Sequence, residues 1–127
     1  MQATRALGAM TWVVADGYIP PESTGPAPAM TSHESVCILN AGAADAVVQL
    51  LVYFTDRPPA GPYLLHVASE RAHHQRINDL REPEPIPTGV DYSMVLSSTE
   101  PIVVQHTRLD SRQAANALMS TIAYPRD

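Results

Sequence analysis

The densest run of hydrogen-bonding side chains in the sequence begins where an apolar segment ends. The apolar letters IVV are followed by QHTRLDSRQ, which ends at position 113. Alternate residues of a strand share one face, so Val104, His106 and Arg108 are predicted to lie together. Arg108 and Arg112 flank Asp110, so an arginine–aspartate pair or a guanidinium fork for a carboxylate forms easily. These residue types predict either a binding site for a small polar ligand or a set of loop and subunit contacts.

Other polar and aromatic residues extend this candidate site. The complete candidate set for ligand binding is Trp12, Tyr18, His33, Glu34, Arg76, Asn78, His106, Arg108, Asp110 and Arg112. Arg108 is expected to anchor a ligand by charge-assisted hydrogen bonds, and His106 and Asp110 to orient it. Trp12 or Tyr18 would supply a stacking face of the kind that sugar sites use, with a place in the core as the alternative for Trp12.

The five histidines raise the question of a metal site, which their spacing does not favour. His73 and His74 are adjacent in a predicted strand, so their side chains point to opposite faces and do not form a chelating pair. His33 and His106 would join a metal site only if folding brought them together. The chain also lacks a GxSxG nucleophile motif and a glycine-rich loop before a helix. We expect a binding protein without metal or cofactor, rather than an enzyme.

The charge balance makes nucleic acid an unfavourable partner. All eight basic residues are arginine, set against 13 acidic residues, and the net charge is -5. Binding to duplex DNA depends on basic residues that neutralise phosphates, so only arginines gathered by oligomerisation would form a basic patch. Cys37 is the single cysteine and lies in an apolar run, so we expect a buried, reduced thiol. No apolar run approaches the roughly 20 residues that span a bilayer. A cytoplasmic protein is expected.

The pattern of short apolar segments separated by proline and glycine predicts an all-β fold. Strands are predicted at positions 11–15, 34–40, 46–54, 63–68, 72–78, 90–97, 101–108 and 120–124. About eight short strands without long helices are typical of an antiparallel β-sandwich, jelly-roll-like in arrangement. At 127 residues we expect one domain, with residues 1–10 as a loose lead-in.

Three segments have a less regular pattern. The four prolines of residues 16–32 predict a long ordered loop across one end of the sandwich. The nearly continuous apolar run at 46–54 is typical of a strand buried on both faces, or on one face with a subunit contact on the other. Between positions 108 and 120, the sequence favours equally an irregular loop and one or two helical turns capped by Asp110 or Ser111.

Two long blocks and one short motif resemble a known family. They are ADGYIPPESTGPAPAMTSHESVCILNAG at 15–42, RINDL at 76–80 and HTRLDSRQAANALMSTIAY at 106–124. In this order they resemble the sensory rhodopsin transducer family, over about residues 12–124. The resemblance implies a small soluble β-sandwich that assembles as a homotetramer. It also implies a partner or a ligand, because one member is paired with a membrane photoreceptor and the wider family resembles a set of small-molecule, including sugar, binding domains.

Two hypotheses about function follow. In the first, the chain is a cytoplasmic homo-oligomeric transducer domain that binds a small polar ligand such as a sugar. In the second, it is a protein-interaction adaptor for a membrane photoreceptor and has no small ligand. Under the first hypothesis, Arg108→Ala abolishes ligand binding and keeps the oligomer. Under the second, the same substitution breaks the oligomer or the partner contact.

Overall fold

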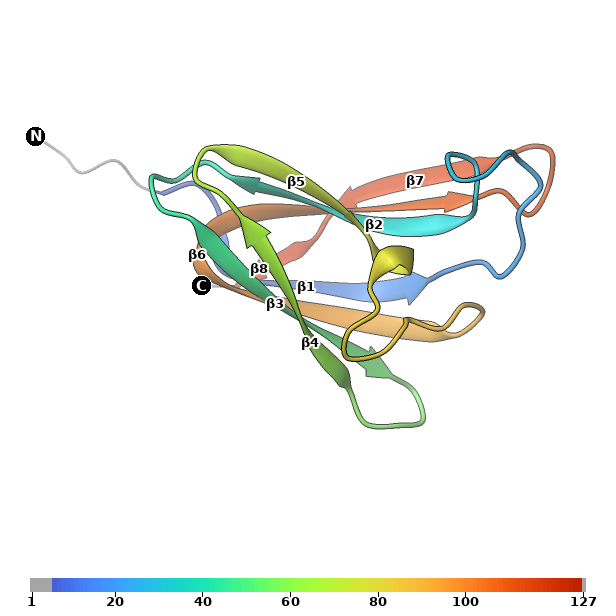
Figure 1. Cartoon of the computed structure of the whole chain (residues 1–127), viewed down its shortest axis with the longest axis horizontal. Helices are drawn as coiled ribbons and strands as arrows, with labels where there is room; N and C mark the ends of the chain where they lie inside the picture. Colours follow the sequence, from blue (N-terminus) through green and yellow to red (C-terminus); the bar gives the residue numbers. More distant parts are fainter. Residues whose placement is uncertain (1–5, 127) are drawn as a thin grey trace, which may run out of the picture.

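The computed structural model describes residues 6–126, which form eight β-strands and one short 3-10 turn (Figure 1). The strands are β1 (Ala9–Tyr18), β2 (His33–Asn40), β3 (Ala46–Phe54), β4 (Ala60–Val67), β5 (Arg71–Arg76), β6 (Asp91–Asp110), β7 (Ala117–Ile122) and β8 (Tyr124–Arg126), with the 3-10 turn η1 at Ile77–Asp79. All pairings among these strands are antiparallel. The predicted all-β sandwich class is confirmed. None of the described residues builds a helix of the length and apolarity that a membrane crossing requires.

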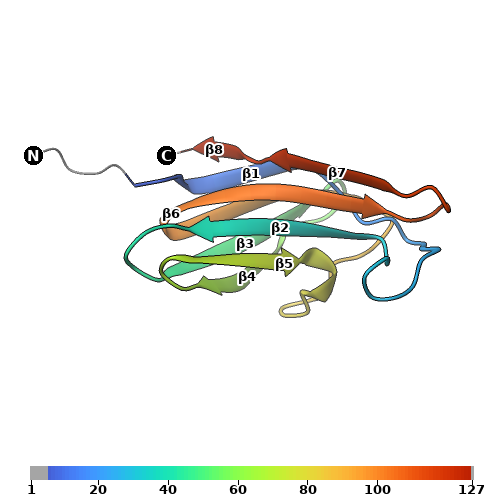
Figure 2. The same ribbon diagram turned by 90° about the horizontal axis from the view of Figure 1, so that it is seen from above.

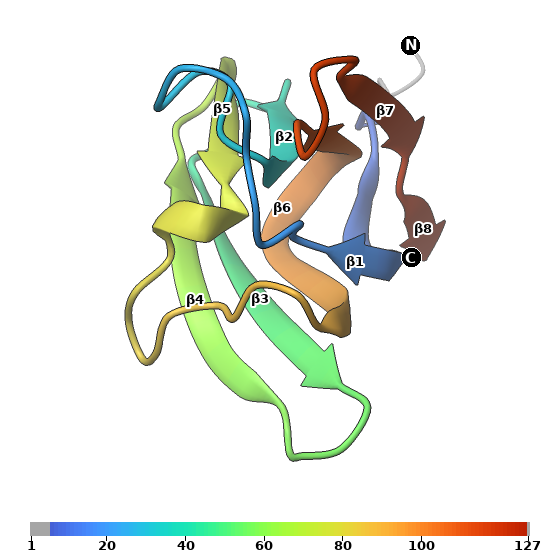
Figure 3. The same ribbon diagram turned by 90° about the vertical axis from the view of Figure 1, so that its right-hand side faces the viewer.

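One long strand, β6, belongs to both layers of the sandwich. Its first half pairs with β1 and β3, and its second half pairs with β2 and β7. We call the layer of β4, β3, the first half of β6, β1 and β8 sheet A, and the layer of β5, β2, the second half of β6 and β7 sheet B. Figure 2 shows the strands of sheet B side by side, and Figure 3 shows β6 running from beside β1 to beside β2.

The continuity of β6 corrects the prediction of two strands separated by a turn at positions 98–100. Strand β6 has 20 residues, so it is not short, and it passes through this segment without reversing direction. Pro101 falls where the β1–β6 register is interrupted, between Ser97 and Ile102. Proline has no N–H to give to a ladder, so it is tolerated where a strand changes partners.

The core lies between the two sheets and follows the alternation of the strands. In β3 the buried side chains are Ala46, Val48, Leu50 and Val52, whereas the residues between them are half-buried or exposed. Strand β3 is therefore buried on one face only. In β2 the alternation places Val36 and Ile38 in the core and leaves Cys37 half-buried on the outer face of sheet B, which corrects the expectation of a buried thiol.

The N-terminal strand is longer than predicted. Strand β1 begins at Ala9, inside the expected lead-in, and continues through Tyr18, past the point where a loop was expected; residues 1–5 lie outside the described residues. Its register with β6 shifts between Val14 and Gly17. At Gly17 a Cβ atom would lie 2.4 Å from Cε1 of Tyr92, so glycine allows the strand to run against this ring.

The loop and the turn at one end of the sandwich are tied to each other. The backbone N–H of Thr24 donates to the carbonyl of Ser111 over 2.7 Å, and the hydroxyls of Ser32 and Ser111 lie 3.1 Å apart. Residues 111–116 form an irregular turn without helical turns, and the chain then continues as β7 and β8 instead of one last strand. The proline-rich segment thus crosses the sandwich end, as predicted, and it also packs on this turn, which was not predicted.

Candidate functional site

A group of ionisable side chains lies buried between the two sheets. Glu34 on β2 faces Arg108 on β6, and His106 lies two residues earlier on the same face of β6. Tyr92 reaches the same place from the half of β6 that belongs to sheet A. Glu34 is 0% exposed and His106 1%, so the carboxylate of Glu34 and the ring nitrogens of His106 are removed from water. We call Glu34, Tyr92, His106 and Arg108 the buried cluster.

Glu34 is the centre of the buried cluster. The Tyr92 hydroxyl donates to its Oε1, and Nε of Arg108 donates to its Oε2 over 2.8 Å. Nε2 of His106 lies 3.0 Å from the same Oε2, but it is not directed along a hydrogen bond and has no hydrogen-bond partner among the described residues. Nη2 of Arg108 contacts both the carboxylate and the carbonyl of Asp16 on β1, each at 3.3 Å. The cluster therefore bonds the two sheets together.

The buried negative charge of the cluster is the carboxylate of Glu34, which is paired with Arg108. Burial raises the pKa of the Glu34 carboxyl, but the contacts with His106, Tyr92 and Arg108 outweigh it and bring this pKa below its usual value. Burial and the neighbouring carboxylate raise the pKa of Tyr92, so its hydroxyl stays protonated and donates. Glu34 is ionised at neutral pH. Burying paired charges is often no more stabilising than an apolar core, and buried ionisable groups with perturbed pKa values cluster at functional sites.

A groove opens beside the buried cluster, between β1 and β7. It has a volume of about 540 Å³, and its lining includes Val13, Asp16, His106, Met119, Ile122 and Tyr124. The groove exists because β8 pairs with β1 only over Thr11–Val13. The neighbouring strand β7 pairs with β6 in sheet B, so it does not cover the rest of this edge of β1. His106 is buried and lines the groove, Asp16 is exposed, and most of the lining is apolar.

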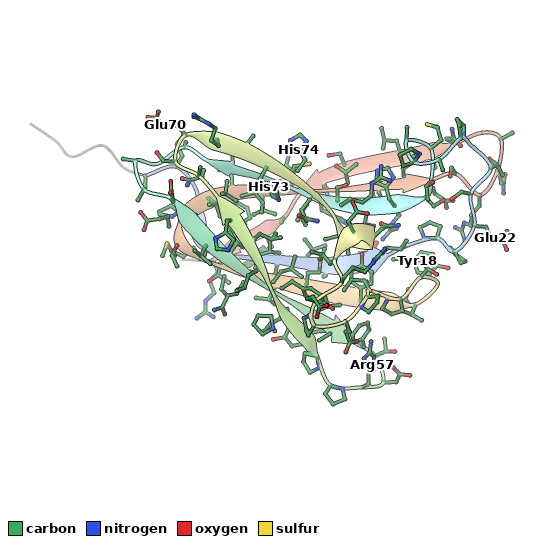
Figure 4. The ribbon with its side chains drawn as sticks, viewed as in Figure 1. Tyr18, Glu22, Arg57, Glu70, His73 and His74 are labelled. Atoms are coloured by element: carbon green, nitrogen blue, oxygen red, sulfur yellow. The ribbon has the colours of Figure 1, made fainter. Side chains whose placement is uncertain are left out.

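A second, more polar pocket lies at the end of the sandwich. It has a volume of about 600 Å³ and is lined by Glu22, Asp110, Arg112, Gln113, Ala115 and Ala117. Nη2 of Arg112 donates to Asp110 over 2.6 Å, and this contact lowers the pKa of the Asp110 carboxyl. The Arg112 guanidinium also lies 5.7 Å from the centre of the Tyr18 ring. Figure 4 shows Tyr18 and Glu22 at this end of the molecule.

The predicted site residues are therefore divided among separate places. Glu34, His106 and Arg108 come together in the buried cluster, and Tyr18, Asp110 and Arg112 meet at the end pocket. Trp12 belongs to neither. It is 4% exposed, and its indole N–H lies 3.0 Å from the carbonyl of Ala9 and 2.9 Å from that of Ile102. Trp12 is a core residue, so the stacking role proposed for it is corrected.

The remaining three predicted residues hold the chain that leads into β2. Arg76 donates to the carbonyl of Pro28 over 2.9 Å, and the side-chain amide of Asn78 donates to the carbonyl of Ser32 over 3.1 Å. Nδ1 of His33 lies 2.7 Å from the carbonyl of Thr31. These contacts fix the end of the proline-rich loop and thereby the position of Glu34, two residues after Ser32.

Sequence reasoning missed Tyr92, Asp16 and the β7–β8 side of the groove. The signal for Tyr92 was present, because it alternates with Met94 and Leu96 on the buried face of β6. A phenol on such a face needs a hydrogen-bond partner, which predicts a buried acceptor nearby. Asp16 was assigned to a loop, and its position beside Arg108 depends on the extension of β1.

The histidines do not gather into a metal site. Across residues 6–126, no three His, Cys, Asp or Glu side chains lie close enough to hold a metal ion. His73 pairs opposite the buried Ile38 and His74 opposite the outward-facing Cys37, which confirms that the two imidazoles point to opposite faces of β5 (Figure 4).

Comparison with known proteins places this fold in a family. The family model described as Anabaena sensory rhodopsin transducer matches residues 7–125. The solved structure of the Anabaena sensory rhodopsin transducer has 50% sequence identity and a TM-score of 0.74, and the match covers 84% of this chain and 100% of that one. The crystal structure of Thermotoga maritima 1070 has 33% identity and a TM-score of 0.85, over 94% of this chain and 97% of that one. A search among curated proteins finds no match. With a family model that spans nearly its whole length, the chain belongs to the sensory rhodopsin transducer family.

Proposed function

We propose that this chain is a cytoplasmic signal-transducer domain that binds a small molecule in the groove between β1 and β7 and acts as a homo-oligomer. One observation carries the proposal: His106 lines the groove and also contacts the buried Glu34 carboxylate, which is bonded to both sheets. A ligand that touches His106 would therefore act on the contact that joins the two layers.

The lining of the groove defines the class of ligand. Apolar side chains such as Met119 and Ile122 form most of its walls, whereas the Asp16 carboxylate and the His106 ring supply polar groups. A small molecule with one apolar face and one hydrogen-bonding edge matches this lining. A sugar has both, and the exposed ring of Tyr124 offers it the stacking face that was first assigned to Trp12.

Arg108 has a different role in this proposal from the one that the sequence predicted. Its Nε is bonded to Glu34 and its Nη2 to Asp16, and its side chain is only 19% exposed. Its charge is already neutralised within the chain. Arg108 therefore positions Glu34 instead of anchoring the ligand, and Arg108→Ala would damage the fold as well as the site.

The proposed transduction step is a change in the contacts of Glu34. A ligand can shift a conformational equilibrium only by its difference in affinity for the two states. Contact with His106 changes the interaction between Nε2 and the Glu34 carboxylate, which also holds Tyr92 of sheet A and Arg108 of sheet B. The relative position of the two sheets at this end then depends on whether the groove is filled.

A thermal-shift screen against sugars, sugar acids and common metabolites tests the proposal. A ligand present at a hundred times its Kd stabilises the protein by about 2.7 kcal/mol, which raises the melting temperature measurably. The hit should be lost in His106→Gln and retained in His74→Gln, a matched control at an exposed histidine of sheet B. A hit that survives His106→Gln and disappears in Arg112→Ala would place the site in the end pocket instead.

The exposed apolar surface of β7 and β8 favours a second candidate function, an adaptor for a membrane photoreceptor. Leu118 is 71% exposed, Ile122 55% and Tyr124 71%. One relative carries the name sensory rhodopsin transducer, and large exposed apolar patches usually meet a partner. Under this alternative the screen finds no ligand, and Leu118→Glu weakens binding to a sensory rhodopsin in detergent micelles while His106→Gln does not.

A further inference from the structure

The end pocket is formed by two segments that are far apart in the sequence. The proline-rich loop supplies Glu22, whereas the end of β6, the following turn and the start of β7 supply Asp110, Arg112, Gln113, Ala115 and Ala117. Figure 1 shows the loop and the turn close together at this end of the sandwich. The groove between β1 and β7 is lined by a different set of residues, so the two cavities are separate places.

Buried hydroxyl groups hold the two segments together. Ser32 is 1% exposed and Ser111 0%, and the backbone N–H of Ser111 donates to the Ser32 hydroxyl over 2.9 Å. The Thr24 hydroxyl lies 2.8 Å from the carbonyl of Ser111 and 3.1 Å from that of Gln113. The walls of the end pocket are therefore fixed in the ligand-free chain. A site that is fixed in advance loses less entropy when it binds a ligand.

Arg112 is held at the end pocket with one edge of its guanidinium unused. Its Nε and Nη2 donate to the Asp110 carboxylate over 3.0 and 2.6 Å, and the Tyr18 ring lies 5.7 Å from the guanidinium. Within residues 6–126, no group accepts a hydrogen bond from Nη1. The Arg112 side chain is 44% exposed, so Nη1 can reach a ligand. A guanidinium edge in a fixed position is a good donor for a carboxylate.

The end pocket also has a carboxylate without a partner. Asp110 is paired with Arg112, but the Glu22 carboxylate forms no ion pair or hydrogen bond with the part of the chain that the structure describes; Glu22 accepts from Ser32 through its backbone carbonyl instead. The pKa of Arg112 is raised, first by its hydrogen bonds to Asp110 and further by the charge of Glu22, so Glu22 lies within electrostatic reach of the guanidinium. An anion alone would be repelled by Glu22, and an amine alone would leave Nη1 without an acceptor.

We propose that the end pocket binds a free α-amino acid as its zwitterion. The ligand ammonium donates to the Glu22 carboxylate, and the ligand carboxylate accepts from Nη1 of Arg112. Ala115 and Ala117 give the side chain of the amino acid an apolar wall. The volume of about 600 Å³ is within the range of small-molecule sites, so it leaves room for that side chain. This site goes beyond the groove proposed above and does not depend on it.

Isothermal titration calorimetry of the full chain with the standard L-amino acids tests the end pocket. We expect at least one of them to bind. Its N-acetyl derivative and its methyl ester each lack one of the two charges, so each should bind at least tenfold more weakly. A derivative that binds as tightly as the free amino acid would contradict recognition of the zwitterion.

Substitutions at the two charged groups locate the binding. Glu22→Gln and Arg112→Gln should each weaken it by about tenfold to a hundredfold, the loss expected when a hydrogen bond between charged groups is removed. Both residues are exposed, so neither substitution disturbs the core, and circular dichroism checks that the variants fold. Glu84→Gln removes a carboxylate from another exposed ion pair, so it is the matched control and should bind as the wild type does.

Two further results would overturn the site. The first is a wild-type chain that binds none of the amino acids. The second is binding that survives both Glu22→Gln and Arg112→Gln. If such binding is lost in His106→Gln, the amino acid belongs to the groove, which supports the function proposed above and refutes the end pocket. Binding that is lost in the two end-pocket variants and kept in His106→Gln supports the end pocket whether or not the groove has a ligand. The failures of the two sites are therefore distinguishable.

Discussion

Replacing Glu34 by glutamine should cost this protein a large part of its stability. The substitution keeps the size of the side chain but removes the negative charge of the carboxylate, whose two oxygens accept hydrogen bonds from Tyr92 and Arg108. Breaking a buried ion pair typically costs 3–5 kcal/mol, because it leaves the other charge buried and unpaired. Arg108 is 19% exposed and keeps its contact with Asp16, so the penalty should fall below that range, at about 2–3 kcal/mol.

Urea denaturation at pH 7 measures this cost against a matched control. Glu84→Gln removes a carboxylate from an exposed ion pair with Arg57, whose side chains are 42% and 41% exposed, and should change the free energy of unfolding by less than about 0.5 kcal/mol. Tyr92→Phe should cost about 1.5–3 kcal/mol, since it removes one hydrogen bond to a charged acceptor. In the double variant the two losses should not add. A loss below 1 kcal/mol for Glu34→Gln would refute the view that this carboxylate holds the sheets together.

The stability difference between the wild type and Glu34→Gln should depend on pH in a defined direction. The folded-state pKa of Glu34 is lowered from 4.5, so the folded protein binds fewer protons at this site than the unfolded chain does. The stability that the ionised carboxylate contributes is therefore complete above about pH 4.5 and is lost as the pH falls through the lower, folded-state pKa. Urea midpoints measured between pH 7 and pH 3 should converge for the two proteins. Curves that stay parallel would show that the pKa of Glu34 is the same in the folded protein and in the unfolded chain.

Three further substitutions test other parts of the structure. Gly17→Ala should destabilise the fold by about 1–3 kcal/mol, because the added Cβ would lie 2.4 Å from the Tyr92 ring; an unchanged urea midpoint would show that the ring is free to move. Trp12→Phe should cost about 1–3 kcal/mol, since it removes the N–H that the carbonyl of Ile102 accepts, and a neutral result would count against a core role. Asp110→Asn should leave the melting temperature of the ligand-free chain unchanged, because its pair with Arg112 is exposed to solvent.

Much of the fold could be predicted from local pattern, because the alternation of a strand is a property of neighbouring residues. The strand at 46–54 was predicted with its observed bounds, since its apolar run is closed by turn residues on both sides. The two sheets could not be predicted in the same way. Ser98, Thr99 and Glu100 form a polar triplet before a proline, which is typical of a turn, yet β6 passes through them because its two halves find partners in different sheets.

The sequence by itself determined the alternation of the strands, the charge of the chain and the presence of His106 and Arg108 on one face of a polar strand end. The tertiary structure alone decided which groups these side chains meet. Glu34 is joined to Tyr92 over 58 positions of sequence and to Arg108 over 74, and no local pattern encodes such a pairing. The tertiary structure also placed Trp12 in the core and formed the groove beside His106. The physical reason is that burial and pairing depend on which strands become neighbours, and that is settled only when both sheets close over one core.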